Sequence, residues 1–433
     1  QACTTYGLLL DNFHLSEFLK MRFHPCKLFS CLRFVLLLGG LVLVWLLNST
    51  WNWETILVAI KIGSNHFPSE GGHKYQMRQG ININYHQIWE KCNQAINGES
   101  IFIPTTDVEE IIDALRSAKI VKADIYSPST SSEYKWILIL EGGQLVHFKP
   151  ALINKTVKES GNCFSGCGHA EYEVAGFTLN RILQLGNMPY ATGRLISWNK
   201  EIKSVATKAL RSSVTIRGDG DVCITWSCYP KRKSRCCFGK GVIHGVVIYW
   251  IRNGIVVQRA KDKGIWRHEF HALGGFLKNF ASILPGNRTF CDRLREMEPY
   301  QTNPFSFRYI LDMAAIDFLM LNYAGGKHTY IAIRNKNIYL DILLDYGLSF
   351  CDRKDPVLLA PIYQCCRIRK SLYRNLLKYS AILTEVFDGA TKDDPLYPQL
   401  LLEDTIAMQQ RLNTIIALVQ ICLKKYKNSE VFL

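Results

Sequence analysis

Three ionisable side chains stand at points of the sequence where a phosphate-transfer site would need them. Lys149 ends an apolar, strand-like segment, Glu173 lies in a helical pattern after it, and Asp345 ends a later apolar run. Phosphoryl transfer needs a cation on the nucleotide phosphates, an acid that holds this cation, a carboxylate on the metal and a carboxylate near the attacking hydroxyl. A lysine or acid at the end of an element is more often a solvated surface residue, so the surrounding pattern has to decide.

The pattern around these residues predicts a small sheet, one helix and then a mostly helical region. β-Branched runs broken by glycine and serine predict an antiparallel meander, and apolar residues at helical spacing predict a helix after it. The expected strands are residues 120–125, 136–140 and 145–150. The expected helices are residues 108–119, 171–185, 310–323, 369–386 and 400–426, with a hairpin at 330–334 and 338–344. This order is typical of a kinase fold.

The composition indicates a folded protein that carries a large positive charge. The formal net charge of +15 suits nucleic acid, an anionic membrane surface, ATP or a sulfated polysaccharide, and does not choose among them. The sequence has no zinc-type CxxC pair, no aromatic RNA-binding motif and no basic helix with base-reading side chains. We therefore expect no nucleic-acid partner.

The cysteines and one apolar run indicate the secretory pathway. The chain has 15 cysteines, and adjacent pairs such as Cys365-Cys366 do not easily share one tetrahedral zinc, so disulfides in an oxidising compartment are the better interpretation. The run FVLLLGGLVLVWLL at residues 34–47 follows a cluster of lysine and arginine, which predicts a signal anchor with a luminal C-terminal side, or a cleaved signal. The sequons at Asn154 and Asn287 fit this location.

Several segments, in the same order along the chain, resemble the secretory kinases called family with sequence similarity 20, and among them the xylosylkinases. They are KIVKAD at 119–124, ILILEGGQ at 137–144, FKP at 148–150, AEYEVA at 170–175, LNRIL at 179–183, GR at 193–194, EIK at 201–203, VAT at 205–207 and LAPIYQCCRIR at 359–369. The last segment is the most specific, because we know it from no other family. The resemblance covers residues 118–426.

The resemblance implies an α+β fold, namely an atypical two-lobed secretory kinase-like fold with disulfides, preceded by an N-terminal signal-anchor helix. It divides the chain into a cytosolic segment (1–33), an anchor (34–47), a luminal stem (48–117), a kinase-like domain (118–426) and a tail (427–433). Within the domain, the N-lobe is expected at 118–210 and the C-lobe at 211–426.

The same resemblance implies roles for the three ionisable residues. Lys149 holds the nucleotide phosphates, Glu173 pairs with Lys149 and assists the metal, and Asp345 binds the metal. The implied cofactors are ATP and Mn²⁺ or Mg²⁺. The implied activity is phosphoryl transfer to a xylose hydroxyl in the linkage region of proteoglycans. We expect a single-pass type II Golgi membrane protein, or a secreted one after cleavage.

The resemblance also implies a disulfide pattern. Cys365 and Cys366 are expected to bond to Cys291 and Cys422. A nested pair of bridges is expected among Cys223, Cys228, Cys236 and Cys237, where the spacing departs from the family because two members are adjacent. The sequence assigns no partner to Cys92, Cys163, Cys167 and Cys351.

The catalytic loop departs from the family pattern Gly-Asn-x-Asp-Arg-His-His-Tyr-Glu, whose aspartate is the base for the acceptor hydroxyl. This chain has LNYAGGKHTY at 321–330, so the aspartate is replaced by alanine without a gap, or by glycine with a one-residue insertion. Neither alignment leaves a carboxylate in the loop, which consists of Ala324, Gly325, Gly326, Lys327 and His328. A positioned base contributes about 10²- to 10⁴-fold, so its loss predicts impaired transfer with nucleotide binding retained.

Two further departures concern the nucleotide site, and together with the loop they keep three interpretations open. The turn at 127–132 has no glycine, and Tyr346 stands where the family has asparagine. The first interpretation is an active kinase whose partner is a xylose acceptor. The second is a pseudokinase that binds nucleotide and regulates an active member of the same family. The third is a luminal scaffold that binds no nucleotide.

Overall fold

The described part of the chain forms one compact unit within residues 80–433. The computed structural model describes residues 83–96, 107–126, 134–151, 169–228, 232–252, 254–258, 291–292, 304–322, 329–333, 338–341, 346–347, 349–350 and 360–433. The apolar run at 34–47 lies outside these residues, as do Cys163, Cys167 and Cys351.

A five-stranded antiparallel sheet carries the first predicted site residue. Its strand order is β1-β2-β3-β8-β4. The strands are β1 (Ile120–Tyr126), β2 (Lys135–Leu140), β3 (Leu145–Pro150), β4 (Ala191–Ser197) and β8 (Val242–Tyr249). The predicted meander of the first three strands is therefore confirmed. Burial alternates along β2, as the period of two requires when only one face of a strand meets the core.

The turn between β2 and β3 depends on glycine. Gly142 and Gly143 have φ values of 82° and 85°, a region that side chains with a Cβ rarely adopt. A Cβ on Gly142 would also lie 2.8 Å from the backbone nitrogen of His86 and 2.9 Å from the Trp89 ring. The indole nitrogen of Trp89 donates to the Glu141 carbonyl oxygen over 2.9 Å, so this turn is fixed against the helix that contains Trp89.

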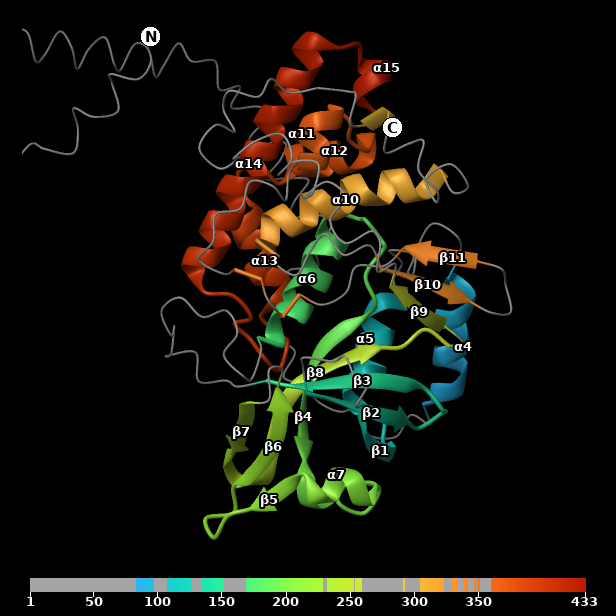
Figure 1. Cartoon of the computed structure of the whole chain (residues 1–433), viewed down its shortest axis with the longest axis vertical. Coiled ribbons are helices and arrows are strands. Elements are labelled where there is room, and N and C mark those ends of the chain that lie inside the picture. Colours follow the sequence, from blue (N-terminus) through green and yellow to red (C-terminus); the bar gives the residue numbers. More distant parts are fainter. Residues whose placement is uncertain are drawn as a thin grey trace, which may run out of the picture. The chain divides into compact units, whose positions relative to one another are not determined.

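Two helices pack against this sheet in Figure 1, namely α5 (Asp107–Ser117) and α6 (Glu171–Ile182). A third helix, α4 (Tyr85–Ala95), packs on α5. The helices predicted near α5 and α6 are confirmed. α6 is buried almost all round, which is expected of a helix that lies between two layers of structure and not at a surface.

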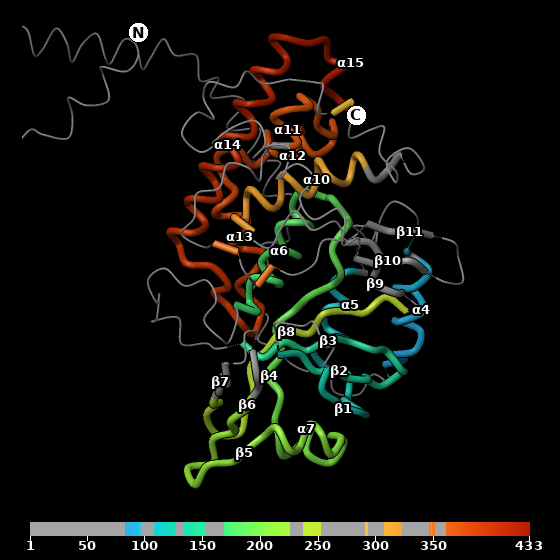
Figure 2. Tube along the Cα trace, in the orientation of Figure 1, coloured from blue at the N-terminus to red at the C-terminus, as the bar shows by residue number. Residues whose placement is uncertain are grey.

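The C-terminal part of the unit is mostly helical and returns to α6. Its helices are α10 (Pro304–Met320), α11 (Ala360–Cys365), α12 (Lys370–Lys378), α13 (Leu383–Thr391), α14 (Leu402–Lys425) and α15 (Asn428–Val431). Figure 2 shows α13 beside α6, although the two are far apart in the sequence. Among the described helices, α14 alone has the length and hydropathy of a membrane span, but it packs on α10, α12 and α13.

The continuous helix predicted over 369–386 is wrong, because α12 ends at Lys378 and α13 begins at Leu383. The side chain of Gln409 explains the interruption. Its Oε1 accepts from the Leu383 backbone N–H over 2.8 Å, and its Nε2 donates to the Ser380 carbonyl oxygen over 2.5 Å. The backbone groups that would continue the helix are satisfied by Gln409 from α14.

Two smaller sheets complete the unit. One contains β5 (Val214–Ile216), β6 (Val222–Cys228) and β7 (Arg232–Phe238). The other has the order β11-β10-β9, with β9 (Gly254–Gln258), β10 (Thr329–Ile333) and β11 (Ile338–Asp341). The predicted hairpin is confirmed as β10 and β11, and β9 is an additional strand that the sequence pattern did not show. Three short helices lie between the strands. They are η1 (Trp198–Ile202), α7 (Lys208–Ser212) and η2 (Gly239–Gly241).

Three disulfides tie the described part of the chain together, namely Cys223–Cys237, Cys291–Cys365 and Cys366–Cys422. The expected partners of Cys365 and Cys366 are therefore confirmed, and one bridge of the expected nested pair is present. It joins residues that lie directly opposite each other in β6 and β7. The side chains of Cys228 and Cys236 lie outside the described part of the structure.

Candidate nucleotide site

A buried lysine and glutamate meet between the sheet and α6. Lys149 lies on β3, opposite Val246 of β8, and Glu173 lies in the first turn of α6. The Lys149 ammonium donates a hydrogen bond to Glu173 Oε1, and the side chains are only 8% and 4% exposed. Because charges withdrawn from water are stable only when paired, each residue fixes the position of the other.

The segment that contains the predicted metal aspartate passes the same glutamate. The backbone N–H of Tyr346 donates to Glu173 Oε1 over 3.1 Å, and the N–H of His169 donates to the Gly347 carbonyl oxygen over 3.4 Å. The start of α6 therefore lies along residues 346–347. Asp345 precedes this segment directly but lies outside the described residues, so its role stays a prediction.

The first turn of α6 also contains a second buried acid that the sequence pattern did not single out. Glu171 is 3% exposed, and its Oε1 is 3.3 Å from His169 Nδ1. Its Oε2 is buried and makes no hydrogen bond. Carboxylates in the first turn are favoured by the helix dipole, which explains why two of them are tolerated here.

His147 adds no charge beside Lys149. It lies two residues earlier on the same face of β3, and its ring lies 4.6 Å from the Trp250 ring and 4.8 Å from the Tyr126 ring. Burial, and then the positive charges of Lys135 and Lys149, lower the pKa of His147 to about 3. The imidazole is therefore neutral at any pH of the secretory pathway.

The end of α10 is fixed just before the predicted catalytic loop. Asn322 donates from its backbone N–H to the Asp317 carbonyl oxygen over 2.8 Å, and from Nδ2 to Asp317 Oδ1 over 3.0 Å. Asp317 and Asn322 are both buried. The loop residues Ala324, Gly325, Gly326, Lys327 and His328 follow this cap and lie outside the described residues.

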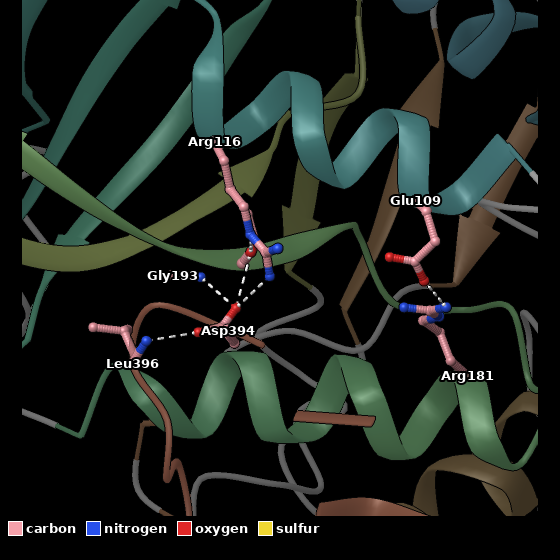
Figure 3. Close-up of polar contacts among 7 residues, drawn as sticks. Glu109, Arg116, Arg181, Gly193, Asp394 and Leu396 are labelled. Carbon is pink, nitrogen blue, oxygen red and sulfur yellow. Dashed lines mark hydrogen bonds and ion pairs between the residues drawn. The ribbon is translucent and has the colours of Figure 1, made fainter. Parts of the chain in front are cut away.

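A buried carboxylate from the C-terminal part braces the sheet that holds Lys149, as Figure 3 shows. Asp394 Oδ2 accepts from Arg116 of α5 over 3.0 Å, from the Thr192 hydroxyl over 2.9 Å and from the Gly193 backbone N–H over 2.9 Å. Its Oδ1 accepts from the Leu396 N–H over 2.9 Å. Sequence reasoning missed this group, because Arg116 and Asp394 are 278 residues apart and no spacing links them.

The second ion pair in Figure 3 joins α5 to α6. Arg181 donates to Glu109 over 2.6 Å, but the Glu109 side chain is 67% exposed. Exposed pairs of this kind contribute little to stability. The buried group around Asp394, and not this pair, is the strong link between α5 and its surroundings.

The chemistry of the site fits a nucleotide with a divalent metal. A buried ammonium suits a phosphate chain, and carboxylate oxygens are the donors that Mg²⁺ and Mn²⁺ prefer. Glu171 lies two residues from Glu173 on α6 and so faces a different side of the helix, and its buried Oε2 is not assigned to this site. No group of three metal-binding side chains occurs among the described residues, which do not include Asp345.

A small antiparallel sheet with a lysine paired to a glutamate on the adjacent helix, followed by a helical part, defines a kinase-like fold. The model of the family "Golgi casein kinase, C-terminal, Fam20" matches residues 87–431. The chain therefore belongs to the Fam20 family.

Known relatives agree with this assignment. The glycosaminoglycan xylosylkinase of Homo sapiens is 30% identical over 345 residues, which are 78% of this chain and 81% of the relative. The structure of hydra Fam20 with sugar superposes with a TM-score of 0.66 at 24% identity, over 82% of this chain and 99% of the other. The Golgi casein kinase with Mn/ADP bound gives a TM-score of 0.62 at 18% identity, over 80% and 83% of the two chains.

Proposed function

We propose that this protein is a secretory-pathway kinase that transfers the γ-phosphoryl group of ATP to a xylose hydroxyl in the linkage region of proteoglycans. The observation that carries the proposal is the meeting of Lys149 and the Tyr346 N–H at one oxygen of Glu173. This contact places the candidate phosphate-binding cation beside the segment that follows Asp345. The choice of xylose is supported by the xylosylkinase relative at 30% identity.

In this proposal each residue of the chain has a defined task. Lys149 binds phosphate oxygens, Glu173 holds the Lys149 ammonium in place, and Asp345 and Glu173 hold the metal. The metal, when bound, neutralises negative charge on the phosphates. A bond forms between the acceptor oxygen and the γ-phosphorus while the bond from the γ-phosphorus to its bridging oxygen breaks. The loop from Ala324 to His328 contains no carboxylate to accept the hydroxyl proton, so another base or solvent accepts it.

The pseudokinase is the second candidate, and the sequence of this loop favours it. A nucleotide site with Lys149, Glu173 and Asp345 but no base can bind ATP while it transfers phosphate slowly. Such a protein would act on an active kinase of its own family. The active-kinase and pseudokinase proposals share the nucleotide site and differ in the transfer step.

The proposed location follows from the covalent chemistry. Disulfides such as Cys366–Cys422 persist in oxidising compartments, which supports a luminal domain. We propose that residues 34–47 anchor the chain in the Golgi membrane as a type II protein, with residues 48–117 as a stem before the kinase-like domain. Release of the luminal part by cleavage is the alternative.

The first experiment measures the thermal stability of the full chain with and without ATP and Mn²⁺. A ligand at 100 times its Kd stabilises the folded state by about 2.7 kcal/mol, so a nucleotide site raises Tm when both ligands are present. The variant Asp345→Ala is expected to lose this rise. The control Asp219→Ala, in an exposed turn before β6, is expected to keep it.

A transfer assay then separates the two kinase candidates. Transfer of labelled phosphate to a xylose-containing acceptor by the unmodified protein, and no transfer by the Asp345→Ala variant, would support the active kinase. A metal-dependent rise in Tm without any transfer supports the pseudokinase. No rise in Tm for the unmodified protein would contradict both candidates and leave the luminal scaffold.

A further inference from the structure

Tyr346 occupies a central place beside the candidate site. The residue is fully buried, and it directly follows Asp345 in the chain. Its backbone N–H donates to the same Glu173 oxygen that receives Lys149. Tyr346 therefore links Asp345, its neighbour in the chain, to the lysine–glutamate pair.

The ring of Tyr346 lies against a glycine on α6. A Cβ built on Gly176 would lie 3.1 Å from Tyr346 Cγ, 3.3 Å from its Cδ1 and 3.0 Å from Met188 Cε. Carbon atoms normally pack about 3.5–4.0 Å apart, so a methyl group at this position would require the Tyr346 ring and the Met188 methyl to move by a few tenths of an ångström. Glycine at 176 allows α6 and Tyr346 to approach this closely.

Glu173 and Gly176 lie on one face of α6, because residues three apart on a helix are neighbours. On this face, the Glu173 carboxylate accepts from the Tyr346 backbone N–H, and Gly176, one turn later, leaves space for the Tyr346 ring. The two contacts hold the backbone and the side chain of Tyr346 against α6. Both contacts of Tyr346 with α6 thus lie directly after Asp345 in the chain.

The hydroxyl of Tyr346 lies near an acid of α10. The Tyr346 hydroxyl makes no hydrogen bond of regular geometry, but the Asp317 carboxylate is close enough to act on it electrostatically. Burial first, and Asp317 second, raise the pKa of the Tyr346 phenol well above its usual range. The phenol is therefore neutral, and Tyr346 interacts with α6 through Gly176 and with α10 through Asp317.

We propose that Tyr346 and Gly176 form a steric pair that sets the distance between α6 and the metal-binding segment, so that Tyr346 is a positioning residue for Asp345 and Glu173. The positioning role rests on the proposed nucleotide and metal binding. The packing of the pair does not, and it can be tested without ligand.

The experiment measures Mn²⁺-dependent ADP binding by calorimetry, together with Tm, in the full chain. Gly176→Ala is expected to weaken Mn²⁺·ADP binding about 10- to 100-fold, as changes to residues that orient metal ligands do. Tyr346→Ala, which removes the ring, is expected to weaken binding as well. In the double variant the added methyl group meets no ring, so binding is expected to exceed that of Gly176→Ala alone.

The control is Gly389→Ala, in an exposed part of α13 with no atom within 4 Å of the added Cβ. It is expected to bind Mn²⁺·ADP like the unmodified protein and to melt at the same or a slightly higher temperature. If replacing any helical glycine with alanine weakened Mn²⁺·ADP binding, Gly389→Ala would weaken it as much as Gly176→Ala does.

Two results would overturn the proposal. One is a folded Gly176→Ala protein that binds Mn²⁺·ADP as tightly as the unmodified chain. The other is a double variant whose loss in Tm equals the sum of the losses of the two single variants. Stability losses at residues in contact are expected not to be additive. Failure of the unmodified protein to bind Mn²⁺·ADP would instead contradict the proposed function and the positioning role. Non-additive Tm losses would in that case still support the steric pair.

Discussion

Replacing Asp394 with alanine is expected to destabilise the fold strongly, because four donors converge on this carboxylate. The donors are Arg116, Thr192, Gly193 and Leu396, and the Asp394 side chain is only 5% exposed. Removing one partner of a buried ion pair costs about 3–5 kcal/mol, since the other charge remains buried without its counter-ion. The free energy of unfolding should fall by about this amount.

Replacing Asp394 with asparagine is expected to cause a smaller loss of stability than replacing it with alanine. Asp394→Asn keeps the shape and one acceptor oxygen but removes the charge, and hydrogen bonds to charged groups contribute about 1.5–3 kcal/mol. The loss in stability should therefore lie below that of alanine. The matched control is Glu109→Ala, which breaks an exposed ion pair worth about 0.2–1 kcal/mol.

Urea denaturation of the full chain, followed by fluorescence, gives the order of stability of these variants. The tryptophans Trp89, Trp136 and Trp198 are all buried in the unit that Asp394 braces, so they report its unfolding. The reasoning is refuted if Asp394→Ala shifts the midpoint no further than Glu109→Ala does. A double variant with Arg116→Ala should restore part of the loss, because the buried cation is then absent.

Two further predictions concern pH and redox state. The folded-state pKa of His147 is about 3 against 6.5 in the unfolded chain, so the unfolded state binds more protons between these values and stability falls as pH falls through this window. Acidification from pH 7 to 5 should cost about 2 kcal/mol, and His147→Phe should remove this dependence in urea titrations at both pH values. Cys422→Ser breaks the bond that closes a loop of 56 residues and should lower the unfolding free energy by about 3–4 kcal/mol. Equal Tm values for Cys422→Ser and the unmodified protein under non-reducing conditions would contradict this expectation.

Local patterns predicted the elements that build the candidate site. The alternating residues of β2 and β3 and the helical spacing after Glu171 each depend on neighbours in sequence, so both were visible without a structure. The structure brings Lys149 and Glu173 together as expected from the resemblance. Their catalytic roles and that of Asp345 remain predictions.

Long-range contacts were not visible in the sequence. β8 enters the sheet between β3 and β4, and no feature of residues 242–249 specifies that position. The interruption after α12 depends on Gln409, which acts from another helix. Likewise, the close packing at Gly176 comes from Met188 and Tyr346, which are distant in sequence, and helix propensity alone would favour alanine there.

Two adjacent cysteines at the end of α11 must each form a disulfide with a different partner for the native protein to fold. Cys365 bonds to Cys291, while Cys366, with a left-handed φ of 49°, bonds to Cys422. During synthesis, Cys365 and Cys366 are both made before Cys422. Cys291 can therefore bond to either of these two adjacent residues before the native partner of Cys366 is present. A wrong first bond is corrected only by thiol–disulfide exchange, which is slow without a catalyst. Production of the native protein therefore calls for a host compartment that supplies a disulfide isomerase as well as an oxidant.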